Sequence, residues 1–146
     1  MDKNQLYQLA GNGEQRRNVE LKRSMAWDDA KAKIAKAILS FSNIRDGGYL
    51  ILGFSQKNNR FEPSGMVSTD LETYNYDNIK SFVSKFADPY AEFSMETVED
   101  LDTGKKFLVF TVNEFEQVPV ICRQSGFNLE QGAIYTRSRR MAETVK

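Results

Sequence analysis

The sequence contains no histidine and a single cysteine, Cys122, among its 146 residues. A disulfide within the chain is therefore excluded, and so is a zinc site built from cysteine and histidine ligands. Catalysis by a serine or cysteine nucleophile paired with histidine is excluded as well. A hydrolase of this composition would depend on carboxylates, lysine and a hard cation such as magnesium, which prefers oxygen ligands.

Long hydrophobic runs are also absent. No stretch approaches the roughly 20 apolar residues that span a bilayer. The first residues lack the apolar core and cleavage pattern of a secretory signal, so we expect a cytoplasmic location. The length suits one hydrophobic core. We therefore expect residues 1–146 to form a single domain, either alone or as the N-terminal fragment of a longer protein.

Charge is balanced in total but uneven along the chain, with 20 basic and 20 acidic residues. From Gly13 to Arg45 there are eight basic residues against four acidic ones, whereas Asp88 to Glu116 holds eight acidic residues and two lysines. Such a distribution can produce one basic and one acidic face, and a basic face attracts a phosphate backbone. A solvated face without a partner is the alternative that charge alone leaves open.

The N-terminal half predicts a βαβ unit. Residues 2–9 suit a short helix, and residues 18–23 alternate apolar and polar side chains as a half-exposed strand does, which places Glu20 and Lys22 on one face. Residues 28–44 have helical apolar spacing. Residues 49–54 are almost wholly apolar and predict a buried strand, parallel to the first strand and either next to it or separated from it by one neighbour.

The C-terminal half predicts a second main helix at residues 76–87 and then an antiparallel meander. Residues 93–98 and 106–113 flank a turn sequence and predict a hairpin. Two further strands, at residues 118–122 and 133–137, are expected to complete the mixed sheet. Cys122 in the first of them is expected to be a small buried hydrophobic side chain. Residues 141–145 suggest a short terminal helix. The fold class is α+β, with one domain and two main helices.

Two short segments suggest local roles. Gly47 and Gly48 permit a tight helix-to-strand turn and the close approach of another backbone or a ligand, and Asn43 suits a cap of backbone groups at that turn. Tyr135 and Arg137 alternate along a predicted strand. Such a pair can stack a base beside a phosphate contact, although packing in the core or at a sheet edge explains Tyr135 equally well.

Four segments together resemble the Schlafen AlbA-like domain: Glu14 with residues 19–24, residues 37–43, residues 47–54 and residues 132–137. The pattern covers nearly the whole chain. The resemblance implies a nucleic-acid-binding module, DNA-binding or RNA-binding, of a kind described among transcriptional regulators. Some members of the family are described as ATP-binding, and animal members include RNA endonucleases with three carboxylates.

We mapped the three carboxylates of these endonucleases residue by residue onto this sequence. Two of them fall on Glu14 and Glu20, and Lys22 is expected to stabilise charge beside Glu20. The third falls on Ser55 and Gln56, neither of which is a charged metal ligand. A Mg²⁺ or Mn²⁺ nuclease site would need Asp28, Asp46 or a partner chain to complete it. We therefore expect binding without efficient cleavage, with a metal-dependent nuclease as the alternative.

The surface expected to contact nucleic acid is basic and follows the predicted first and last strands; it consists of Arg16, Arg17, Lys22, Arg23, Tyr135 and Arg137. A second alternative is a protein-interaction or ATP-binding module. The acidic strands and Trp27 suit a protein partner, whereas no glycine-rich phosphate loop supports a nucleotide site. A homo-oligomer or an additional domain is compatible with the sequence.

Overall fold

The computed structural model describes residues 1–11, 13, 16–138 and 144–145. Four helices and ten short or medium strands lie in this part of the chain. In chain order the elements are α1 (Lys3–Ala10), β1 (Val19–Lys22), α2 (Trp27–Ser42), β2 (Gly48–Leu52), β3 (Phe54–Lys57), β4 (Arg60–Pro63), α3 (Ser68–Leu71), α4 (Tyr76–Ser84), β5 (Ala87–Asp88), β6 (Phe93–Asp100), β7 (Lys105–Val112), β8 (Ile121–Cys122), β9 (Thr136–Arg137) and β10 (Thr144–Val145).

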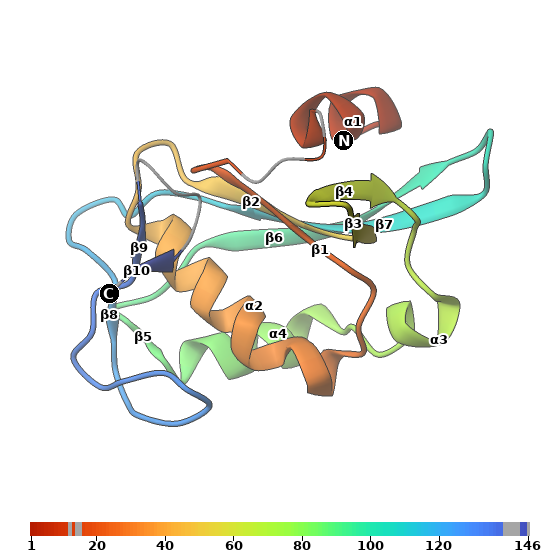
Figure 1. Ribbon diagram of the computed structural model, residues 1–146. Helices are drawn as coiled ribbons and strands as arrows, with labels where there is room; N and C mark the ends of the chain where they lie inside the picture. Colours follow the sequence, from red (N-terminus) through yellow and green to blue (C-terminus); the bar gives the residue numbers. More distant parts are fainter. Residues whose placement is uncertain (12, 14–15, 139–143, 146) are drawn as a thin grey trace.

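The main sheet has four strands in the order β1-β2-β7-β6. β1 and β2 are parallel neighbours joined through α2, and β7 is antiparallel to both β2 and β6. This arrangement confirms the βαβ unit, the central hairpin and the α+β class predicted from the sequence. α1 covers one face of the sheet, and α2 and α4 cover the other (Figure 1).

Both faces of the central strands are buried. Leu50 and Leu52 of β2 pack with α2 and α4, whereas Ile51 between them packs with α1. A strand covered on both faces needs apolar residues at every position, which explains the continuous apolar run. No helix in the described ranges is long and apolar enough to cross a membrane.

Trp27 and Cys122 both have structural roles. Trp27 starts α2 and packs edge-on against the rings of Tyr74 and Phe82. Cys122 is buried, as predicted, and burial raises the pKa of its thiol. A buried thiol with a raised pKa is a poor nucleophile.

The C-terminal strands are where the sequence prediction was wrong. β8 pairs with β5 and β9 pairs with β10, each as a separate two-stranded ribbon, so neither extends the main sheet. Residues 144–145 form a strand where a helix was expected, and residues 141–143 lie outside the described residues. β9 runs beside α2 instead, and this position brings the C-terminal segment to the edge of β1 (Figure 1).

The Gly47-Gly48 turn is tight because the protein's own atoms approach both residues. Gly47 has φ +66°, and a Cβ added there would lie 2.0 Å from the carbonyl oxygen of Val112. A Cβ on Gly48 would lie 2.1 Å from the ring of Phe41. The close approach predicted from the sequence is therefore made by β7 and α2.

Gly47→Ala is expected to lower the free energy of unfolding by about 2 kcal/mol more than Gly104→Ala, the difference being the cost of overpacking. Gly104 is the matched control because its φ is +76° and nothing lies within 4 Å of an added Cβ. Both alanines carry the strain of positive φ, so chemical denaturation of the two variants isolates the clash with Val112. Equal losses would contradict the close approach.

Candidate functional site

The basic residues near β1 flank the β1 edge of the main sheet, whose first three residues are buried. Arg16 and Arg17 lie in a tight turn before β1, closed by backbone hydrogen bonds of 3.1 and 3.2 Å between Arg16 and Val19. Lys22 ends the strand and Arg23 follows it. Arg16 and Arg23 are exposed, whereas Arg17 and Lys22 are half-buried. A four-residue strand is about 13 Å long, so these cations lie at the two ends of one short edge.

Glu20 lies between the two ends and is held by two cations. The ammonium of Lys22 lies 2.9 Å from Oε2 of Glu20, on the face of β1 that the alternation predicted. The guanidinium of Arg137 donates through Nη1 to Oε1 of the same carboxylate. Glu20 is 9% exposed. Both of its oxygens are thus occupied by the protein's own cations.

Arg137 lies inside the protein, and it therefore drops out of the surface predicted from the sequence. Its side chain is 0% exposed. Nε donates to the carbonyl of Arg17 and Nη2 to the carbonyl of Arg16, both at 2.9 Å. The guanidinium also lies 4.8 Å from the ring centroid of Phe41 on α2. Arg137 consequently fixes the turn that presents Arg16 and Arg17 and offsets the charge of Glu20.

Tyr135 is also buried, so its ring is not available to stack on a base. Its hydroxyl accepts a hydrogen bond of 3.0 Å from the backbone N–H of Glu130. The ammonium of Lys36 lies 5.0 Å from the ring centroid. The core-packing role that the sequence left open is therefore the one found, and β9 begins only at Thr136.

Asn43 links three segments through its amide. Nδ2 donates to the carbonyls of Val120 and Tyr135, each at 2.9 Å, and Oδ1 accepts from the N–H of Val120 at 2.8 Å. Nδ2 also donates to the carbonyl of Leu39 at 3.3 Å, which is a backbone-capping contact at the end of α2. The contacts of the amide extend beyond the turn itself, because Asn43 ties the end of α2 to the segments before β8 and β9.

Among the described residues, the candidate metal ligands do not form a cluster. Glu14 lies outside the described residues. Ser55 is exposed and its hydroxyl lies 2.6 Å from that of Ser64. Asp28 is at the start of α2, 3.6 Å from Lys31, and Asp46 is exposed in the turn before β2. Over the ranges that the structure describes, no three histidine, cysteine, aspartate or glutamate side chains are grouped to hold a metal ion.

The opposite edge of the sheet is acidic. β6 carries Glu96, Glu99 and Asp100, and Glu92 precedes it. Lys3 and the N-terminal ammonium pair with part of this edge, at Asp100 and Glu96. The charge separation expected from the sequence is thus a separation between the β1 edge and the β6 edge, because these strands are the two ends of the sheet order.

Comparison with protein families gives one match that covers most of the chain. The model of the family described as "Schlafen, AlbA_2" matches residues 15–146. No curated protein sequence matches the chain.

Two solved structures are similar in fold. The crystal structure of the DIP2311 protein from Corynebacterium diphtheriae has 15% sequence identity and a TM-score of 0.59; the match covers 97% of this chain and 25% of that one. The solution NMR structure of the N-terminal domain of a RecG-related protein from Nitrosomonas europaea, described in relation to an ATP-dependent DNA helicase, has 22% identity and a TM-score of 0.56. That match covers 92% of this chain and 87% of the domain. The chain spans about a quarter of the first protein's length.

Proposed function

The chain belongs to the Schlafen, AlbA_2 family, and on this premise we propose that it is a nucleic-acid-binding module whose β1 edge contacts the phosphate backbone. The observation that carries the proposal is the grouping of Arg16, Arg17, Lys22 and Arg23 at the two ends of one sheet edge. Phosphate contacts from exposed cations supply most of the affinity in binding that is not sequence-specific.

The charge balance along this edge supports the proposal. Glu20 alone would repel phosphate, but Arg137 and Lys22 pair with it. The buried Arg137 offsets the charge of Glu20, so the other four cations of the described edge, Arg16, Arg17, Lys22 and Arg23, give it a net charge of four. Arg16 and Arg23 are the most accessible of these cations, so we assign them the main phosphate contacts. The positive charge of this edge suits contact with the phosphate backbone, which fixes position without reading sequence.

The fold comparison is consistent with this role. The Nitrosomonas domain of the same fold belongs to a protein whose description relates it to a DNA helicase. We take this relation to a DNA helicase as support for the proposed contact of this chain with nucleic acid.

Binding is proposed to be independent of a metal ion. A divalent cation at Glu20 would have to displace Lys22 or Arg137 from the carboxylate, and the desolvated pair with Arg137 opposes that exchange. Phosphodiester cleavage needs a metal held firmly enough to polarise the phosphate and activate water. We therefore propose binding without efficient cleavage, with nuclease activity as the alternative to be tested.

Labelled RNA and DNA incubated with the protein and Mg²⁺ or Mn²⁺ are expected to remain intact on a denaturing gel, while fluorescence anisotropy in EDTA still reports binding. Glu20→Gln is the diagnostic variant, since it keeps the side-chain shape and an oxygen acceptor toward Arg137. Robust cleavage by the wild type that disappears in a folded Glu20→Gln protein would identify a metal-dependent nuclease instead. Binding that requires the metal would also contradict the proposal.

A further inference from the structure

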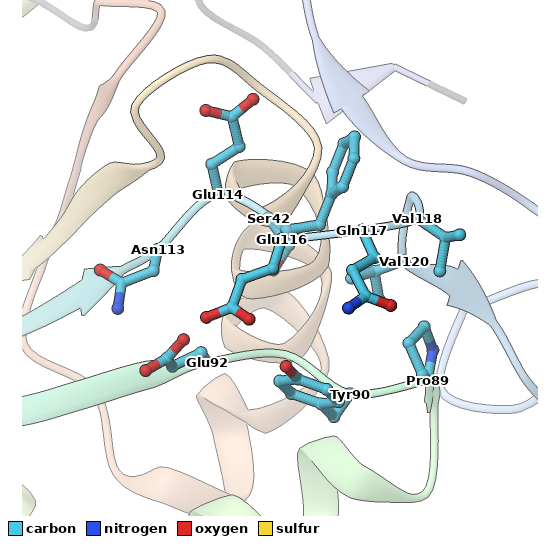
Figure 2. Close-up of a pocket in the computed structure, with 11 residues that line it drawn as sticks. Ser42, Pro89, Tyr90, Glu92, Asn113, Glu114, Glu116, Gln117, Val118 and Val120 are labelled. Carbon is cyan, nitrogen blue, oxygen red and sulfur yellow. The ribbon is translucent and has the colours of Figure 1, made fainter.

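A cavity of about 410 Å³ lies where β7 ends and β6 begins, away from the β1 edge. One wall is formed by residues 89–92 and the other by residues 113–118, with Ser42 of α2 at the base (Figure 2). Its location was missed by the sequence analysis. The only signal in the sequence was the excess of acidic residues between Asp88 and Glu116.

The walls of this cavity are fixed by backbone hydrogen bonds. The N–H of Asn113 donates to the carbonyl of Glu92 at 2.9 Å, which joins the two walls. The N–H of Phe115 donates to the carbonyl of Ser42, also at 2.9 Å. Asn43 holds Val120 at the far end of the segment. The cavity is therefore formed before any ligand binds, and a preformed site loses less entropy on binding.

Two carboxylates, those of Glu92 and Glu116, point into the same space between the walls (Figure 2). Glu114 is turned away and accepts a hydrogen bond of 3.0 Å from the N–H of Asp46. Among the described residues, neither Glu92 nor Glu116 forms an ion pair. The cavity thus presents two uncompensated negative charges.

Apolar surface lines the same cavity. Tyr90 is 57% exposed and Val118 is 53% exposed, and both form part of its walls beside Pro89. Covering these two side chains with an apolar group would be favourable, since about 25 cal/mol is gained per Å² of apolar surface removed from water. A metal ion would contact only the two carboxylates. In the described part of the chain, this cavity included, no three histidine, cysteine, aspartate or glutamate side chains are grouped to hold one.

We propose that this cavity binds an arginine side chain in a basic segment of a partner protein. The guanidinium lies between Glu92 and Glu116, and the alkyl stem packs on Tyr90 and Val118. Arginine fits better than lysine because its planar group pairs with carboxylates in a bidentate manner and stacks on an aromatic ring. Nucleic acid is excluded as the occupant because its phosphates would be repelled by the two carboxylates. The site is thus separate from the proposed phosphate contacts on β1.

The test uses a fluorescein-labelled peptide, Gly-Leu-Arg-Leu-Gly, and the same peptide with citrulline in place of arginine. Citrulline has the same shape without the charge. Fluorescence anisotropy is expected to show that the arginine peptide binds at least about tenfold more tightly, equivalent to about 1.4 kcal/mol. Glu92→Gln with Glu116→Gln should remove this preference, and Tyr90→Ala should weaken binding of both peptides.

Glu62→Gln with Glu72→Gln is the matched control, because these two glutamates are also exposed and lie on β4 and next to α3. The control protein should bind as the wild type does. Equal affinity for the two peptides, equal weakening by the control pair, or no binding of the arginine peptide at millimolar concentration would each overturn the proposal. Circular dichroism of each variant establishes that it is folded, as expected for substitutions of exposed glutamates.

Discussion

Arg137→Met is expected to lower the free energy of unfolding by about 3 to 5 kcal/mol, as is typical when one partner of a buried ion pair is removed. Methionine fills a similar space but cannot donate. Glu20 would lose one of its two cations while remaining 9% exposed, and the carbonyls of Arg16 and Arg17 would lose the guanidinium that binds them. Urea denaturation followed by circular dichroism measures the loss.

Arg23→Met is the control, because Arg23 is exposed and donates only to the neighbouring carbonyl of Ser24 among the contacts described. It should change the free energy of unfolding by no more than about 0.5 kcal/mol. Adding Glu20→Met to Arg137→Met should recover part of the loss, because the unpaired carboxylate is then removed as well. Equal effects of Arg137→Met and Arg23→Met would contradict the buried pair.

The N-terminal half of the fold could be predicted because each element has a periodicity of its own. The alternation in β1 specified the shared face of Glu20 and Lys22, and the apolar run of β2 specified a strand covered on both sides. Two strands joined by a helix leave few arrangements, and the parallel pairing of β1 and β2 is one of them. Local sequence and topology point to the same structure here.

The C-terminal half could not be predicted in the same way. The apolar residues of β8 and β9 predict extended chain, but nothing in them specifies the pairing of β8 with β5 or the position of β9 beside α2. The pairing and position of short strands outside a central sheet are determined by tertiary contacts. The amide of Asn43, which binds both segments, is one such contact.

The burial of one side chain in the candidate site, that of Arg137, could not be predicted from the sequence either. A charged residue on a predicted strand is expected to be exposed, since arginine is rarely buried unless it is paired. The partners of Arg137 are Glu20 and two backbone carbonyls, about 120 positions earlier in the chain. Arg16 and Arg23 are exposed, as arginine usually is, and this could be expected from the sequence alone. The half-buried position of Arg17 could not be expected in the same way.

Arg16→Ala with Arg17→Ala is expected to weaken binding of every nucleic acid by a similar factor, roughly tenfold, because phosphate contacts are independent of base sequence. The two alanines retain the carbonyl oxygens that accept hydrogen bonds from Arg137, so the turn should keep its shape. Lys85→Ala with Arg123→Ala removes the same charge from two exposed positions away from β1 and should have little effect. Equal weakening by both pairs would assign the effect to net charge.

The central claim, that the β1 edge binds the phosphate backbone, is tested most directly by the salt dependence of wild-type affinity for single- and double-stranded DNA and RNA. Four phosphate contacts predict that affinity for duplex DNA falls roughly a hundredfold between about 50 and 200 mM salt, and that the slope becomes shallower by one to two contacts in the Arg16→Ala, Arg17→Ala variant. Absence of binding to all four nucleic acids at the lower salt concentration, or an affinity that does not change with salt, would contradict the claim.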